Sequence, residues 1–140
     1  MMKQRAILIL LLLFSTIFMQ SCITSRDIHV EISCDEFTEN PKSMQNDFQI
    51  EVGDKVYIEL CSNPSTGFKW NYDLSGDNVL KEEGYDFEEP DGDVVGASGK
   101  EVWTFEAIEK GTTVINMEYS QPWQGGIKGE WTYRINVVVD

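Results

Sequence analysis

Residues 48–72, FQIEVGDKVYIELCSNPSTGFKWNY, hold two runs of alternating apolar residues on either side of a short polar segment. The apolar residues share one parity before the segment and again after it: Phe48, Ile50, Val52, Val56, Ile58 and Leu60, then Phe68, Trp70 and Tyr72. A period of two is that of a β-strand with one buried face. The pattern therefore predicts two strands joined by a loop at residues 63–68.

The residues of the predicted loop are Asn63, Pro64, Ser65, Thr66, Gly67 and Phe68. Pro64 fixes its own φ and keeps Asn63 extended, whereas Gly67 permits backbone angles that other residues avoid. Ser65 and Thr66 can hydrogen-bond to nearby backbone groups. A stiff loop of this kind loses little entropy on binding, which suits insertion into the cleft of another molecule. An ordinary connecting turn of similar composition is the alternative interpretation.

The other regular patterns after residue 27 are also typical of strands. Apolar residues alternate in four further segments, residues 28–34, 102–108, 113–119 and 131–139. No segment keeps an apolar period of about 3.6 residues over a helix length, although the acidic middle of the chain has room for a short helical turn. About seven short strands in roughly 110 residues predict an all-β fold in which two sheets form a sandwich.

The first 21 residues have the pattern of a signal peptide. Lys3 and Arg5 precede thirteen mostly apolar residues, 6–18, whereas a transmembrane helix needs about 20. The segment ends Met19-Gln20-Ser21-Cys22, which resembles a bacterial lipobox.

On this interpretation residues 1–21 are a lipoprotein signal peptide, and Cys22 is the lipidated first residue of the exported chain. Residues 22–27 form a short linker, and residues 28–140 form one domain. The lipid anchors the protein to a membrane of the bacterial cell envelope without spanning it. An ordinary secretory signal is the alternative.

Composition argues against several partners. The signal peptide holds two of the 11 basic residues and none of the 24 acidic ones. The exported part therefore carries nine basic and 24 acidic residues, a net charge of −15, which disfavours binding to nucleic acid or anionic lipid.

An acidic run extends over residues 73–93, and such runs are usually solvated loops or sheet edges. Within it, Asp91-Gly92-Asp93 lacks the ligand spacing of a calcium loop, so we expect no metal site.

Two cysteines, Cys34 and Cys61, remain besides Cys22. An oxidising envelope would allow them to form a disulfide. In the strand predicted at residues 28–34, the alternation places Cys34 on the inward-facing side. Cys61 is out of step with the inward-facing residues of its own strand. The sequence leaves both states open and favours unpaired cysteines, because a core-facing thiol and a strand-end thiol need not come within bridging distance.

The sequence also argues against catalysis. Its one histidine, His29, lies on the polar parity of its strand, and a nucleophile needs a base that a third group orients. One histidine and two spare cysteines at wide spacing cannot form a closed zinc site. We therefore expect no enzyme activity and no cofactor.

Two further loops contain residues suited to close contact. Gly96, Ala97, Ser98 and Gly99 precede one predicted strand, and Gln121, Pro122 and Trp123 follow another. The first segment is also compatible with a flexible turn. Trp123 lies outside the alternating pattern, and a loop tryptophan either packs on its own domain or serves as a binding anchor.

Together the three loops resemble the motifs of the chagasin-type cysteine peptidase inhibitors. Residues 63–68 resemble that family's Asn-Pro-Thr-Thr-Gly-Tyr/Phe signature. Residues 96–99 lie where the family carries Gly-x-Gly-Gly, and Gln121-Pro122-Trp123 lies where it carries Arg-Pro-Trp. The order and spacing agree over about residues 45–140. Two positions differ from the family motifs. Ser98 replaces a glycine that allows the loop to approach its target closely, and Gln121 replaces an arginine and so removes a positive charge.

This resemblance implies an immunoglobulin-like sandwich that acts as a monomer and inhibits papain-like cysteine peptidases reversibly. Loop 63–68 would enter the active-site cleft, with Thr66 and the backbone around Gly67 meeting the catalytic Cys and His of the target. The other two loops would grip the sides of the cleft, with Trp123 stacking against the enzyme. No covalent step and no cofactor are implied.

An alternative function is a β-sandwich adhesion or glycan-binding module. Its stacking platforms would be the four tryptophans, Trp70, Trp103, Trp123 and Trp131. Three of them fit strand parity, so they are expected in the core, and only Trp123 is expected to be exposed.

Overall fold

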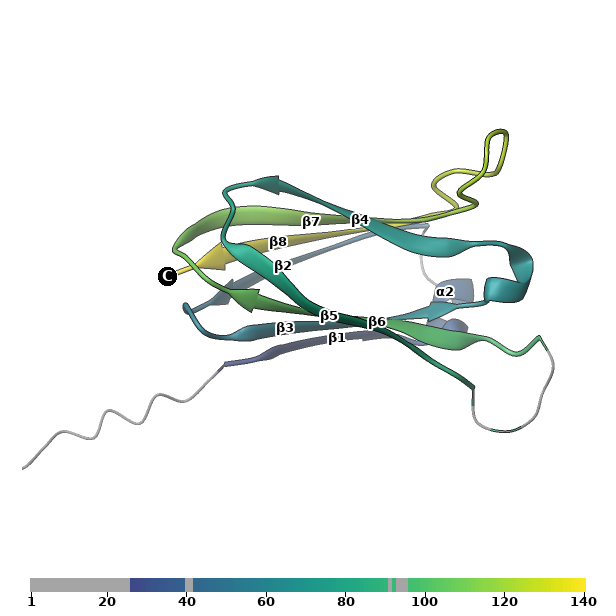
Figure 1. The fold of residues 1–140 in the computed structure, drawn as a ribbon, viewed down its shortest axis with the longest axis horizontal. Helices are drawn as coiled ribbons and strands as arrows, with labels where there is room; N and C mark the ends of the chain where they lie inside the picture. The colour runs from purple at the N-terminus through teal and green to yellow at the C-terminus, as the bar shows by residue number, and fades with distance from the viewer. Residues whose placement is uncertain (1–25, 40–41, 91, 93–95) are drawn as a thin grey trace, which may run out of the picture.

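Two four-stranded β-sheets packed face to face make up the computed structural model, which describes residues 26–39, 42–90, 92 and 96–140 (Figure 1). The first sheet has the order β1 (Ile28–Ile32), β3 (Lys55–Ser62), β6 (Gly99–Ala107), β5 (Leu80–Glu88). The second has the order β2 (Ser43–Ile50), β8 (Trp131–Val139), β7 (Gly111–Ser120), β4 (Lys69–Gly76). The pairs β1/β3 and β2/β8 are parallel, and the other neighbours are antiparallel. The predicted all-β, immunoglobulin-like sandwich is confirmed, with eight strands instead of about seven.

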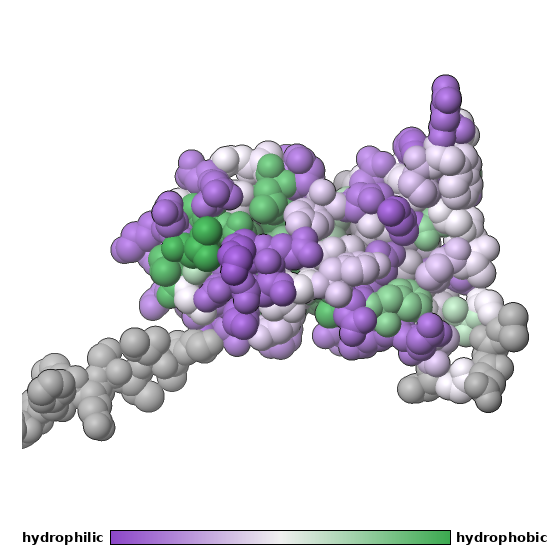
Figure 2. Space-filling model, in the orientation of Figure 1, coloured by the Kyte–Doolittle hydropathy of each residue, from purple (hydrophilic) through white to green (hydrophobic). Residues whose placement is uncertain are grey.

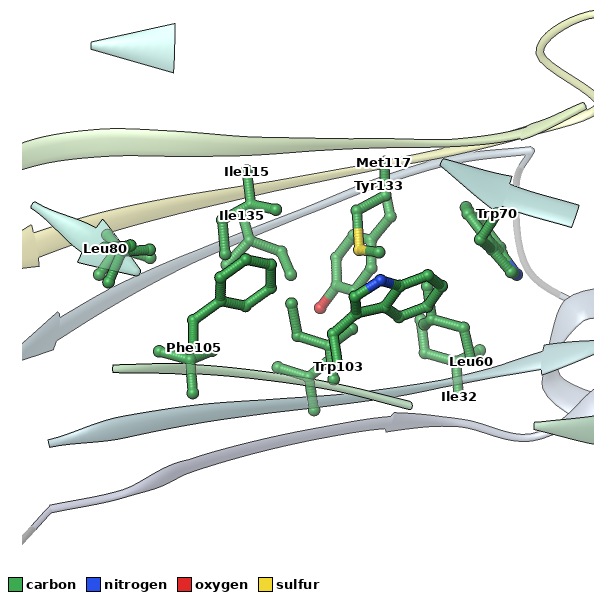
Figure 3. Close-up of a cluster of buried hydrophobic side chains, with 14 of the residues drawn as sticks. Ile32, Leu60, Trp70, Leu80, Trp103, Phe105, Ile115, Met117, Tyr133 and Ile135 are labelled. Carbon is green, nitrogen blue, oxygen red and sulfur yellow. The ribbon is translucent and has the colours of Figure 1, made fainter. Parts of the chain in front are cut away.

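The core lies between the sheets and consists of the inward-facing side chains, which are every second residue of the strands. In β6 every second residue from Gly99 to Ala107 is buried, and β3 and β8 alternate in the same way. Figure 3 shows Trp103 and Phe105 of the first sheet pointing toward Ile115 and Tyr133 of the second. This alternation fixes the register of the strands, because a slip of one residue would turn each apolar set toward water.

The central part of the acidic run, residues 80–88, forms β5, which lies at the edge of the first sheet. The expectation of a sheet edge is confirmed, and the idea of a helical turn in this region is wrong for Leu80–Glu88. Charged side chains on an edge strand prevent pairing with other chains. Asp91 and Asp93 lie outside the described residues.

A short helix, α2 (Cys34–Glu39), follows β1 and was not expected from the sequence. Ser33 and Glu36 cap it reciprocally. Both the backbone N and the Oγ of Ser33 donate to the Glu36 carboxylate at 2.8 Å, and Glu36 N donates back to Ser33 Oγ at 3.4 Å. These hydrogen bonds hold the pKa of Glu36 below its usual value. The Ser-x-x-Glu spacing is a helix-start signal that strand parity obscured.

The expectation that Cys34 and Cys61 stay unpaired is wrong, because the two residues form a disulfide with 5.0 Å between their Cα atoms. Strand β1 runs parallel to β3 and places Ile32 opposite Leu60. The residues just beyond these positions are therefore neighbours. Since Cys34 begins a helix, its side chain does not follow the parity of β1.

The two ends of the sandwich carry different features. The chain enters at one end, where Arg26 N donates to Asp54 Oδ1 at 2.9 Å, beside the turn between β2 and β3. We call this the far end, and the opposite end, which carries the loops discussed below, the loop end (Figure 1). The predicted signal peptide and Cys22 lie outside the described residues, and within the described part no helix is long and apolar enough to cross a membrane.

Candidate functional site

Hydrogen bonds bring the three sequence-predicted loops together at the loop end. We call residues 63–68 the Asn-Pro loop, residues 96–99 the Gly-Ser loop and residues 121–130 the Trp loop. Asn63 Nδ2 donates to Gly96 O at 2.9 Å, and Gln121 Nε2 donates to Thr66 O at 3.3 Å. The Asn-Pro loop is therefore the middle element, tied directly to both of the others.

Hydrogen bonds from its own side chains brace the backbone of the Asn-Pro loop. Asn63 is extended, with φ −123° and ψ 92°, and caps the single 3₁₀ turn η1 (Pro64–Thr66). Its Oδ1 accepts from Ser65 N at 3.1 Å and from Ser65 Oγ at 2.6 Å. Thr66 Oγ1 donates to Asn63 O at 2.7 Å. The polar residues thus stiffen the turn, as the sequence predicted.

Gly67 ends this turn and is covered by Trp123. Its φ of 78° lies in the left-handed region, and its N–H donates to Pro64 O at 3.0 Å. A β-carbon at this position would lie 2.3 Å from Cη2 of Trp123. Gly67 is therefore required both by its backbone angles and by the indole ring packed against it. Trp123 itself stays half exposed, at 50%.

An aromatic layer supports the Asn-Pro loop from the core side. Asn63 N donates to the hydroxyl of Tyr119 at 2.9 Å. The ring of Tyr119 stacks on Phe68 with 5.3 Å between centroids and lies 5.2 Å from Trp70. Phe68 thus belongs to the support of the loop more than to its exposed tip.

The four residues of the Gly-Ser loop differ in their surroundings. Gly96 is exposed with φ of 81°, and a β-carbon there would meet nothing within 4 Å. Gly99 is buried as the first residue of β6, where a β-carbon would lie 2.2 Å from Glu88 O. Gly99 is thus needed for packing against β5, whereas Gly96 is available for close approach. Ala97 and Ser98 are half-buried between them.

Gln121 organises the Trp loop. Its N–H donates to Ile127 O at 2.8 Å, and its Oε1 accepts from Ile127 N at 3.0 Å, which closes the loop on itself. The ammonium of Lys128, a residue the sequence reasoning missed, donates to Gln121 O and at 3.4 Å to Trp123 O. Pro122 and Trp123 are left exposed at the tip.

Helix α2 adds a fourth element to this end. Phe37 is buried, with its ring centroid 5.6 Å from Trp70 and 4.6 Å from Trp131. A groove of about 600 Å³ is lined by α2 and by residues of all three loops. Figure 2 shows that the surface around this end is mostly polar or neutral on this face, with apolar side chains concentrated toward the far end.

One buried acidic residue near the loops escaped the sequence reasoning. Glu101 is 2% exposed and lies on the inward parity of β6 together with Trp103 and Phe105. The sequence did carry a signal for this residue: an acidic side chain stands at a strand position where the alternation places buried apolar residues. Such a residue deserves notice because a buried acid needs hydrogen-bonding partners.

The described residues offer little that would support catalysis. They contain no group of three His, Cys, Asp or Glu side chains placed to hold a metal ion. His29 is exposed on β1 and stacks on Tyr57 at 4.5 Å, as a surface histidine would.

Comparison with known proteins agrees with this arrangement. The profile of the chagasin family of peptidase inhibitors, I42, matches residues 49–137, which include all three loops. Chagasin of Trypanosoma cruzi is 34% identical over 80 residues, 54% of this chain and 73% of chagasin. Amoebiasin-2 of Entamoeba histolytica is 34% identical over 84 residues. That match covers 55% of this chain and 63% of amoebiasin-2, so the chain spans less than two thirds of its length.

Solved structures share the fold. The crystal structure of the cysteine protease inhibitor EhICP2 from Entamoeba histolytica has a TM-score of 0.61 at 22% identity, and covers 72% of this chain and 100% of that one. PbICP-C, in complex with falcipain-2, has a TM-score of 0.57 at 16% identity, with coverage of 81% and 99%. These likenesses concern the fold, whereas the family match rests on the sequence. The protein belongs to the chagasin family of peptidase inhibitors, and is an inhibitor rather than an enzyme.

Proposed function

We propose that this protein inhibits papain-like cysteine peptidases by filling their active-site cleft with the Asn-Pro loop. The observation that carries the proposal is the direct linkage of the three loops at one end of the sandwich. Asn63 and Gln121 tie the outer loops to the middle one, and Trp123 packs on Gly67. A surface organised before binding loses little entropy when it binds.

In the proposed complex the exposed Thr66 and the backbone of the partly covered Gly67 enter the cleft and meet the catalytic Cys and His. Gly67 has no side chain, and the Thr66 hydroxyl is held by Asn63 O, so the tip is narrow. Gly96 and Ala97 contact one wall of the cleft, and Pro122 and Trp123 contact the other. Inhibition is reversible occlusion, since the loops offer no group suited to a covalent step.

The relatives support this choice of target. EhICP2 is a cysteine protease inhibitor, and PbICP-C has been observed in complex with falcipain-2. The chain has the same fold and the family's sequence profile across its loops.

The alternative function, glycan binding or adhesion, has weaker support. Trp70 and Trp103 are 2% and 4% exposed. Trp131 packs against Phe37 and Tyr119. Trp123 alone is exposed, and one ring is too small a platform for a sugar chain.

We further propose that lipidated Cys22 anchors the protein to a membrane of the bacterial cell envelope and that the protein acts as a monomer. The position of Arg26 at the far end supports the proposal. An anchor attached there leaves the loop end directed away from the membrane. A single copy carries all three loops, so one molecule presents the whole contact surface.

The proposal is tested by titrating the chain from residue 23 onward against papain and a cathepsin L-like enzyme with a fluorogenic substrate. We expect reversible loss of activity near a one-to-one ratio. A trypsin-like serine peptidase is the control and should stay active. Full papain-like activity in the presence of excess folded protein would reject the proposal.

A further inference from the structure

The carboxylate of Glu101 lies buried between the two sheets beneath the Asn-Pro loop and accepts three hydrogen bonds. Its Oε1 accepts from Ser62 Oγ at 2.6 Å and from Trp70 N at 3.0 Å. Its Oε2 accepts from the hydroxyl of Tyr85 at 3.1 Å. Because Glu101 is only 2% exposed, these three donors take the place of the water that would otherwise hydrate its carboxylate.

Two of these donors lie on the two stems of the Asn-Pro loop. Ser62 is the last residue of β3 and directly precedes the loop. Trp70 is the second residue of β4 and is separated from the loop only by Lys69. The two strands belong to different sheets, so the sheet ladders do not join them. A single oxygen of Glu101, from β6, therefore connects both stems across the sandwich.

The Trp70 N–H explains why an acceptor is needed at this point. Among the strands that the structure describes, β4 is at the edge of its sheet and pairs only with β7, but Trp70 is buried. A buried N–H on the outer side of an edge strand has no strand partner and is costly when unpaired. Glu101 supplies the acceptor, and the Trp70 indole adds a second link by donating from Nε1 to Cys61 O at 3.0 Å.

We propose that Glu101 is a positioning residue for the inhibitory surface: it fixes the spacing of the two stems so that the Asn-Pro loop keeps its binding shape. Tyr85 orients the carboxylate by binding its other oxygen. This inference rests on the proposed function, because it assigns Glu101 a role in presenting that same loop. An apolar residue in its place would leave Ser62 and Trp70 unpaired in the core.

The test compares Glu101→Gln with Glu101→Ala. The amide oxygen of the Gln variant can still accept from both stems, and its NH₂ can donate to Tyr85, so we expect near wild-type inhibition of papain. The Ala variant leaves both donors unpaired, and we expect inhibition weaker by about tenfold or more. Hydrogen exchange of the Thr66 and Gly67 amides, measured without peptidase, should be faster in the Ala variant alone.

A matched control separates positioning from general stability. Val137 is fully buried in β8 and pairs with Thr113 and Phe48 toward the far end. Val137→Ala should lower the melting temperature without changing loop exchange or inhibition. If Glu101→Ala does not fold, Ser62→Ala removes one stem donor and should show a smaller change in the same direction.

The proposal is overturned if folded Glu101→Ala, or Ser62→Ala in its place, keeps wild-type loop exchange and inhibition. It is also overturned if Val137→Ala changes both readouts as strongly. Should the wild-type protein fail to inhibit papain, the proposed function fails, but loop exchange in the Ala and Gln variants still decides the role of Glu101.

Discussion

The indole ring of Trp123 lies against the α-carbon of Gly67, so that a β-carbon on Gly67 would come within 2.3 Å of Cη2 and 2.8 Å of Cζ3. The residue expected to anchor the protein on its target is thus packed on the residue expected to enter the cleft. The Asn-Pro loop and the Trp loop are therefore coupled within the free protein.

Gly67→Val should weaken inhibition strongly. The substitution forces a β-branched residue into the left-handed region and displaces the Trp123 ring, and we expect a loss of about 2 kcal/mol or more in binding. Thr66→Ala removes the hydrogen bond to Asn63 O and should cost less, about 1 kcal/mol. The inhibition constant for papain measures both effects, and the reverse order would show that the Thr66 side chain makes the critical contact.

Gly53→Val is the matched control for Gly67→Val. Gly53 has φ of 97° and lies at the far end, where a β-carbon would meet nothing within 4 Å. It carries similar backbone strain, so the variant should lose stability in urea without losing inhibition. Equal loss of inhibition in both variants would assign the Gly67 effect to stability.

Trp123→Ala should cost about 2 kcal/mol or more in binding, as expected for a large anchor at an interface. The indole is half exposed and also covers Gly67, so its removal deletes contact area and loosens the loop tip. Isothermal titration against papain measures the change. Val52→Ala, at an equally exposed position at the far end, should bind like wild type. A folded Trp123→Ala protein with unchanged affinity would remove Trp123 from the site.

Asn63→Asp should separate the Asn-Pro loop from the Gly-Ser loop. The substitution keeps the acceptor for Ser65 but replaces the donor to Gly96 O with a carboxylate oxygen. Repulsion between the two oxygens should cost about 1 to 3 kcal/mol in inhibition, measured as the inhibition constant. Asn71→Asp adds the same charge at an exposed position on β4 and should have little effect. A comparable loss in both would point to net charge instead of loop geometry.

Replacing Cys34 and Cys61 with serine should destabilise the fold by about 3 to 4 kcal/mol, the chain-entropy value for a closed loop of this length. The sequence separation is 27. Urea unfolding under oxidising conditions measures the difference, and wild-type protein treated with a reductant should match the double variant. Equal midpoints with and without reductant would show that the disulfide adds nothing. We expect inhibition by the folded variant to persist, since Glu101 still joins the loop stems.

Stability should fall as the pH rises from about 10 to about 12. Burial, followed by the charge of Glu101 and the hydrogen bond to it, raises the pKa of Tyr85 to about 12. Burial raises the pKa of Tyr133 to about 12 as well. Unfolded tyrosine titrates near 10, so the folded state retains these protons. The contribution of the two tyrosines to folding stability is complete below pH 10. It is lost as the pH rises through their pKa in the folded state.

Urea unfolding at a series of alkaline pH values measures this decline. Tyr85→Phe removes one of the titrating groups, so the stability of that variant should fall less steeply over the same window. An identical slope in the variant would show that Tyr85 does not contribute.

Several features follow directly from the order of residues. Period-two apolar patterns predicted most strands, because alternation alone determines which face of a strand is buried. Pro64 and Gly67 predicted a stiff loop, since their backbone preferences are local. Trp123 was separated from the core tryptophans by its place outside the alternating pattern. The spacing of Ser33 and Glu36 is also a local signal, for the start of a helix. It was overlooked because the alternating apolar residues before it favoured a strand.

Other features arise only when strands distant in the sequence meet. The parallel pairing of β1 with β3 brings Cys34 to Cys61, and no local pattern encodes which strands become neighbours. The packing of two sheets places Glu101 between the stems of one loop, and the arrangement of loops lays Trp123 on Gly67. Local conformation depends on each residue and its neighbours in the chain, so the sequence by itself determined the strands and the loop chemistry. Contacts across the sandwich depend on sheet pairing and packing, so only the tertiary structure decided the disulfide, the buried carboxylate and the joining of the three loops into one surface.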